Sequence, residues 1–235
     1  MKKLISENVV IVANNLNPSL FTQLWLVRQG IIEEEDFAPN SVFSQFVTQV
    51  STPEFQLLVV PEQLQFTLAE KSKDDLDLIK EKVGTIIKKI PHTPYRAIGA
   101  NFHWLFAPEP PEIFVEFMRN LFAKPGIAIY ERFSESDARF GAYMSKDVFG
   151  VRLRLNIKSV RSINEENPEE VKESLQLAFN YHLDLAEGTD IIDRMLDFLE
   201  QWNQMRLYSE ELVSVVMGNT RSGYTNMPRR GREKL

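Results

Sequence analysis

The chain of 235 residues has no cysteine, three histidines and ten glycines. The absence of cysteine excludes disulfides, thiolate zinc sites and cysteine nucleophiles. The few glycines are scattered, and the sequence has no Walker loop and no G-x-G-x-x-G or G-x-S-x-G motif. The usual loops for nucleotide phosphates and the serine nucleophile elbow are therefore missing, and no cofactor is expected.

Long hydrophobic runs are also missing. No apolar stretch approaches the ~20 residues needed to cross a bilayer, and the first residues, "MKKLISENVVIVANN", carry no small-residue cleavage site of a signal peptide. With 43% hydrophobic and 26% charged residues, the composition is that of an ordinary globular protein. We expect a soluble cytoplasmic protein with one large domain or two fused units.

The charge is unevenly distributed along the chain. The formal net charge is −6, but residues 218–235 contain five Arg or Lys and one Glu, so the preceding part is more acidic than the total. An acidic body argues against a protein dedicated to the phosphate backbone of nucleic acids, where affinity comes mostly from Lys and Arg. The terminal segment lacks apolar periodicity, and we expect a disordered basic tail.

Hydrophobic periodicity predicts the same order of elements twice. In the first half it predicts a strand, a proline-initiated helix capped by Asn17, three strands and a long helix, at 8–14, 17–30, 42–51, 54–60, 62–69 and 72–90. In the second half it predicts a strand, a proline-led helix, four strands and a final long helix, at 97–107, 108–123, 127–133, 137–145, 149–159, 174–185 and 190–217.

Short turns between the strands favour antiparallel pairing, and helices with a single apolar stripe must cover one face of a sheet. The predicted fold class is α+β, with a duplicated β-α-β(3-4)-α unit and a curved antiparallel sheet whose helices pack on one face. The predicted domains are a β-α-β-β-β-α half at 1–92, a β-α-β-β-β-β-α half at 93–217, and the tail at 218–235.

This element order resembles the fold of the TATA-box-binding protein, in which helices cover one side of a curved antiparallel sheet and the other side faces a ligand. The resemblance covers about residues 8–217 and implies no DNA-binding chemistry, because matching phenylalanine pairs are absent and the charge is acidic. The segments "TPEFQLLVVPEQLQFTL", "RAIGANFHWLF" and "LAFNYHLDLAEGTDIIDRMLDFLEQWNQM" resemble a sporadically distributed family of bacterial proteins of about this length, to which no function is assigned. That resemblance implies a bacterial origin and no catalytic residues.

The segment "GVRLRLNIKS" at 150–159 alternates polar and apolar residues, which is typical of a strand with one buried face. The same alternation occurs around "NFH" at 101–103 and "NYHLD" at 180–184. The candidate partner-binding residues share the predicted polar face: Arg152, Arg154, Asn156, Lys158, Asn101, His103, Asn180, His182 and Asp184. Gln63, Gln65 and Thr67 extend this face into the first half.

Three functions are open for this polar face, besides that of a solvated surface that aids solubility. The first is a non-enzymatic bacterial binding or scaffold protein that holds an unknown protein partner; a homodimer is also open. The second is a nucleic-acid-binding protein that uses the face and the basic tail. The third is a metal-assisted hydrolase centred on His103, His182 and Asp184, since two histidines and a carboxylate can bind a divalent metal.

Overall fold

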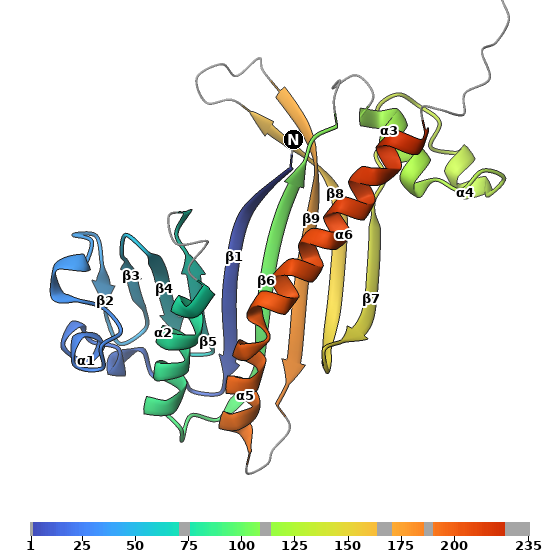
Figure 1. Ribbon diagram of the computed structural model, residues 1–235. Coiled ribbons are helices and arrows are strands. Elements are labelled where there is room, and N and C mark those ends of the chain that lie inside the picture. Colours follow the sequence, from blue (N-terminus) through green and yellow to red (C-terminus); the bar gives the residue numbers. More distant parts are fainter. Residues whose placement is uncertain (1, 71–75, 109–113, 164–170, 186–189, 224–235) are drawn as a thin grey trace, which may run out of the picture.

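The computed structural model describes residues 2–70, 76–108, 114–163, 171–185 and 190–223. Within these residues, nine strands form one open antiparallel sheet, and the main helices pack on one of its faces (Figure 1). The predicted α+β class and antiparallel pairing are therefore confirmed. No described helix is long and apolar enough to span a membrane.

The sheet has the strand order β2-β3-β4-β5-β1-β6-β9-β8-β7, so β1 and β6 lie side by side at its centre. The strands are β1 (Lys2–Ala13), β2 (Val42–Phe43), β3 (Thr48–Ser51), β4 (Phe55–Val60), β5 (Gln63–Leu68), β6 (Tyr95–Phe106), β7 (Ala142–Val148), β8 (Val151–Ile163) and β9 (Val171–Asp184). The first strand of each half pairs with the last strand of the same half, β1 with β5 and β6 with β9.

The helices cover the middle of the sheet. α2 packs on β5, whereas α5 and α6 pack on β6, and α6 also contacts β9 (Figure 1). The helical elements are η1 (Pro18–Leu20), α1 (Gln23–Arg28), η2 (Glu34–Asp36), α2 (Leu76–Lys89), α3 (Phe114–Phe122), α4 (Ala128–Glu131), α5 (Ile191–Glu200) and α6 (Trp202–Gly223), where η denotes a 3₁₀ helix.

The core lies between the sheet and these helices. Alternate strand residues such as Val9, Phe66 and Phe102 are fully buried, because each strand turns every second side chain toward the helices. Trp202 at the start of α6 is also fully buried, and its ring lies 4.7 Å from that of Phe102. Met195, Phe198 and Met205 of the same helical region are buried as well, as expected for a helix whose apolar stripe covers the sheet.

A β-bulge in β1 shifts the alternation of that strand. Leu4 pairs with Trp104 and Ser6 with His103, which leaves Ile5 as the extra residue. As a result Leu4 and Glu7 point to the same side, toward the helices. There the fully buried Glu7 carboxylate contacts Arg206 of α6, with Oε2 3.1 Å from Nε.

The segment 127–133 was predicted as a strand, and this prediction is wrong. It contains the short helix α4, and Ile127, Ile129 and Phe133 are exposed rather than alternately buried. Its apolar residues are spaced as in a strand, but no neighbouring strand pairs with them within the described residues. Among the described residues the second half consequently has three strands after its helices, and the first half has four, because a two-residue strand, β2, precedes β3.

Two helix predictions need correction. Asn17 caps a helix as predicted, accepting a hydrogen bond from the Ser19 amide, but that helix is only the 3₁₀ turn η1. The α-helix begins after a second cap, Thr22, so its register differs from that of a helix begun at Asn17, and Leu20 and Leu24 are exposed.

The final helix is divided at Gln201 into α5 and α6. α6 extends through Gly223, so residues 218–223 of the predicted tail are helical; residues 224–235 lie outside the described part of the chain.

Candidate partner-binding face

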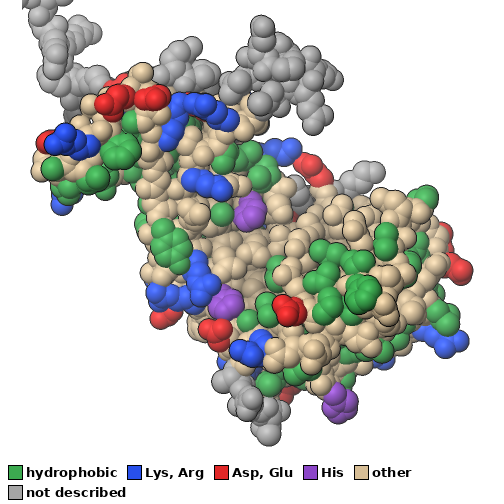
Figure 2. Space-filling model, turned by 180° about the vertical axis from the view of Figure 1, so that it is seen from behind, with side chains coloured by type: hydrophobic (Ala, Val, Ile, Leu, Met, Phe, Trp, Pro, Cys, Tyr) green, Lys and Arg blue, Asp and Glu red, His purple; other side chains and the backbone are tan. Residues whose placement is uncertain are grey.

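The side of the sheet opposite the helices carries most of the polar side chains predicted as a site. We call this side the open face. Figure 2 shows it: Lys and Arg gather over the β7 and β8 side, and hydrophobic side chains gather over the N-terminal half. Strand register accounts for the hydrophobic part, since Val10, Val12, Leu58 and Val60 occupy open-face positions on β1 and β4.

Three asparagines form a hydrogen-bonded ladder across the centre of the open face. Asn8 of β1 lies opposite Asn101 of β6, which lies opposite Asn180 of β9. The Asn180 side chain donates to Asn101 Oδ1 at 2.8 Å, and the Asn101 side chain donates to Asn8 Oδ1 at 2.9 Å. The ladder links the two halves of the chain and fixes the positions of three side-chain amides on the open face.

A second row of hydrogen-bonded side chains lies in the first half, on β5. There Gln63 donates to Gln65 at 3.4 Å, and Gln65 donates to Thr67 at 3.1 Å. Thr67 lies opposite Asn8 in the register. Of the three residues predicted for the polar face of the first half, Thr67 therefore lies next to the asparagine ladder, and Gln65 and Gln63 follow it along β5.

The basic residues of β8 are placed by the turn that precedes this strand. Phe149 and Gly150 both have positive φ, 55° and 73°, which is the geometry of a two-residue type I′ turn. This turn sets Val148 opposite Val151, so Arg152 lies opposite Asp147 and Arg154 opposite Ser145. All the even-numbered residues from 152 to 158 are exposed on the open face, as predicted from alternation.

The cations on β8 differ in their contacts. Arg152 donates to Asp147 Oδ1 at 3.0 Å and to Ser145 Oγ at 2.6 Å, so its charge is partly compensated. Within the part of the chain that the structure describes, Arg154 and Lys158 have no ion-pair partner, although both are exposed. The uncompensated positive charge of this strand is therefore at Arg154 and Lys158.

The register separates the two histidines of the predicted metal site. His103 lies opposite Ala178, whereas His182 lies opposite Gly99, four residues further along the pair. Four residues of strand span roughly 14 Å, too far for one ion to be shared. His182 is instead hydrogen-bonded to Asp184, with Nε2 3.0 Å from Oδ1, and no group of metal ligands occurs among the described residues. The hydrolase hypothesis thus lacks the clustered ligands on which it depends.

His103 lies where a positive charge is unfavourable. Partial burial lowers the pKa of its imidazole below the usual 6.5, and the positive charge of nearby Lys158 lowers it further. His103 is therefore neutral at pH 7. Acidification below its lowered pKa would add a second positive charge beside Lys158 on the open face.

Sequence reasoning missed the role of Asn8. The predicted strand, 8–14, begins at Asn8, whereas Asn8 lies in the middle of β1 and is the largely buried first member of the ladder. The alternation in the segment preceding Asn8 was obscured by the bulge at Ile5. The exposed Tyr143, opposite Asn156, was missed as well, because β7 was predicted to end at residue 145 and its faces were not assigned.

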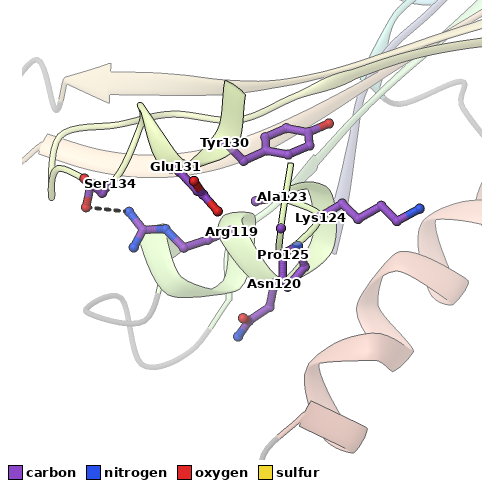
Figure 3. A pocket seen from close by; sticks show the side chains of 9 residues that line it. Arg119, Asn120, Ala123, Lys124, Pro125, Tyr130, Glu131 and Ser134 are labelled. Carbon is purple, nitrogen blue, oxygen red and sulfur yellow. Dashed lines mark hydrogen bonds between the residues drawn. The ribbon is translucent and has the colours of Figure 1, made fainter. Parts of the chain in front are cut away.

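A separate pocket of about 280 Å³ lies between α3 and α4 (Figure 3). Arg119 lines it, but its guanidinium is held by the backbone carbonyls of Phe133, Ser134 and Glu135, at 2.9 to 3.4 Å. Arg119 also lies 5.9 Å from the ring centre of Phe140. These contacts tie α3 to the segment after α4, and they account for the arginine without a ligand.

Fold and site together define an α+β protein whose described residues form a nine-stranded open antiparallel sheet with a polar, partly basic open face. No protein-family model matches the chain, and no curated protein matches its sequence.

Proposed function

We propose that the chain is a non-enzymatic binding or scaffold protein that holds an acidic segment of a partner protein on its open face. The observation that supports this most is the presence of Arg154 and Lys158, exposed and without ion-pair partners in the described residues, on a protein of net charge −6. Complementary charge attracts and orients a partner even where it adds little affinity.

The amides beside these cations favour a polypeptide as the partner. Asn and Gln side chains both donate and accept hydrogen bonds, as the peptide backbone does, whereas phosphates only accept. Asn156 lies between Arg154 and Lys158 on β8, and Asn180 lies opposite Arg154 on β9. An acidic peptide would find cations for its carboxylates and amides for its backbone within one surface.

The experiment compares an Arg154→Glu/Lys158→Glu variant with the wild type for binding of a fluorescent deca-glutamate peptide at low ionic strength. We expect at least about tenfold weaker binding and an unchanged melting temperature, since exposed charges contribute little to stability. The matched control, Lys88→Glu/Lys89→Glu, makes the same change in charge at the exposed end of α2, on the helix side, and should retain most of the binding.

Three results would contradict the proposal. Equal loss in both variants would mean that the peptide responds only to net charge. Undiminished binding by the Arg154→Glu/Lys158→Glu variant would show that these two residues do not belong to the binding site. A single-stranded decanucleotide that binds more tightly than the peptide, with a steep linear dependence of log K on log salt, would favour the nucleic-acid alternative.

We further infer that the two halves of the chain, 1–92 and 93–217, arose by duplication. In support, each half begins with a strand that pairs with its own last strand, and β1 and β6, the two first strands, pair with each other. Homologous sequences would test this: the averaged profile of the first half should align with that of the second, and the absence of any similarity would contradict it.

A further inference from the structure

The two edges of the sheet are unequal. β2 at one edge has only two residues, whereas β7 at the other has seven, Ala142–Val148. On its inner side β7 pairs with β8 along its whole length. On its outer side no strand and no backbone hydrogen bond occurs within the described part of the chain. β7 therefore presents a row of unpaired peptide groups, which is a template for a further strand.

Both faces of β7 are largely exposed, although Lys146 on the helix side donates to the Tyr208 hydroxyl of α6 and lies 4.8 Å from the centre of its ring. Its five central residues are exposed, including Tyr143 on the open face, 66% exposed, and Met144 on the helix side, 47% exposed. Edge strands that must stay single are usually short, bulged, interrupted by proline or charged. β7 has no proline and pairs with β8 in an unbroken register, so its protection against pairing rests on two charges, Lys146 and Asp147.

We propose that β7 pairs antiparallel with β7 of a second copy of this chain, about a two-fold axis that passes between the two Ser145 residues. The paired strands would join the two sheets into one. This inference concerns a different surface from the partner-binding proposal and does not depend on it. The open faces of both copies would lie on the same side of the joined sheet.

The length of the strand favours this axis. Ser145 is the middle residue of β7, so an axis there is the one that pairs all seven residues, Ala142 with Val148 of the second copy through to Val148 with Ala142. An axis at Met144 would leave Asp147 and Val148 without strand partners. Side chains also keep their faces, because opposite residues in an antiparallel pair point to the same side.

The charges favour the same axis. It places Lys146 opposite Met144 of the second copy and Asp147 opposite Tyr143, so no like charges meet. An axis at Lys146 would place the two Lys146 side chains opposite each other, which is unfavourable. Both exposed hydrophobic residues of β7 would gain a cross-strand neighbour.

The absence of cysteine permits a direct test of the axis. Residues opposite each other in an antiparallel pair have Cβ atoms about 4.5–5.5 Å apart, close enough for a disulfide with slight adjustment. Ser145→Cys in the full chain should therefore form a disulfide-linked dimer under mild oxidation, seen on a non-reducing gel. Ser19→Cys, exposed near the opposite edge of the sheet, is the matched control and should remain monomeric on the gel.

A second pair of variants tests the register without a cross-link. Met144→Lys would place a lysine opposite Lys146 of the second copy at two sites in each dimer. We expect it to raise the dimer dissociation constant about fivefold or more in sedimentation equilibrium. Met144→Glu at the same exposed position should tighten the dimer. Circular dichroism should show both variants folded, since the side chain is exposed in the single chain.

The results separate the possibilities. A wild-type dimer, a Ser145→Cys cross-link and opposite effects of Lys and Glu at residue 144 would support the proposed pairing. A wild-type chain that stays monomeric at high concentration would overturn it. A dimer that ignores both Met144 substitutions and leaves Ser145→Cys reduced would overturn it as well, because that dimer would use another surface.

Discussion

Replacing Arg206 by Met is expected to lower the free energy of unfolding by about 3–5 kcal/mol, because it leaves the buried Glu7 carboxylate without its cation. Glu7 is fully buried beneath α6, and its Oε2 atom lies 3.1 Å from Arg206 Nε. Methionine retains much of the aliphatic volume of arginine, so the loss reports mainly on the charge. Guanidinium unfolding followed by tryptophan fluorescence would measure it.

A double variant separates the charge from the packing. Glu7→Met/Arg206→Met removes both charges, and we expect it to recover most of the stability, since a buried ion pair can often be replaced by apolar residues at little cost. The control is Glu200→Gln, which breaks the more exposed pair that Glu200 forms with Lys80 at 2.9 Å and should cost at most about 1 kcal/mol. Equal stability of the single and double variants would contradict the buried-charge argument.

Trp202→Ala should be similarly destabilising, by about 3–5 kcal/mol, through the cavity left by a large fully buried side chain. Trp202 begins α6 directly after the break at Gln201, and its ring packs on Phe102 of the central strand β6. The substitution therefore removes a contact that fixes the helix on the sheet. Chemical unfolding of the variant, followed by circular dichroism, would measure the loss.

Leu207→Ala on the same helix is the matched control for this cavity. Leu207 is 64% exposed, so its truncation should change stability by no more than about 0.5 kcal/mol. A loss of less than 1 kcal/mol for Trp202→Ala would show that α6 does not depend on this ring for its position.

The fold class was predictable because most strands and long helices keep a clear period. The strand around Leu153 alternates without a break, and Ile79, Val83, Ile86 and Ile87 of α2 recur at helical spacing; all are buried as that spacing predicts. The errors fall where local pattern and tertiary contacts disagree. The alternation of Ile127 and Ile129 favours a strand, but no described strand pairs with this segment, and it forms the turn of α4.

The candidate site was predictable for single strands but not across them. Alternation alone placed Arg154, Asn101 and Asn180 on polar faces. Which residues become neighbours across strands depends on register, however. The Phe149-Gly150 turn sets the register of β7 with β8, and the bulge at Ile5 shifts that of β1 with β6. The hypothesis of a metal site at His103, His182 and Asp184 fails on the register of a third pair, β6 with β9, in which the two histidines are four residues out of step.

The central pairing of β1 with β6 has a consequence for the order in which the chain folds. β1 can pair with β5 as soon as the first 68 residues are synthesised, but its other edge must wait for residues 95–106. β6 in turn must wait for β9, at residues 171–184. Such long-range contacts form slowly, because the chain loses the entropy of the intervening loop before the contacts stabilise it. During synthesis the growing sheet therefore has an edge strand with unpaired backbone groups and apolar side chains, first β1 and then β6. Mispairing with another nascent chain would begin at this edge.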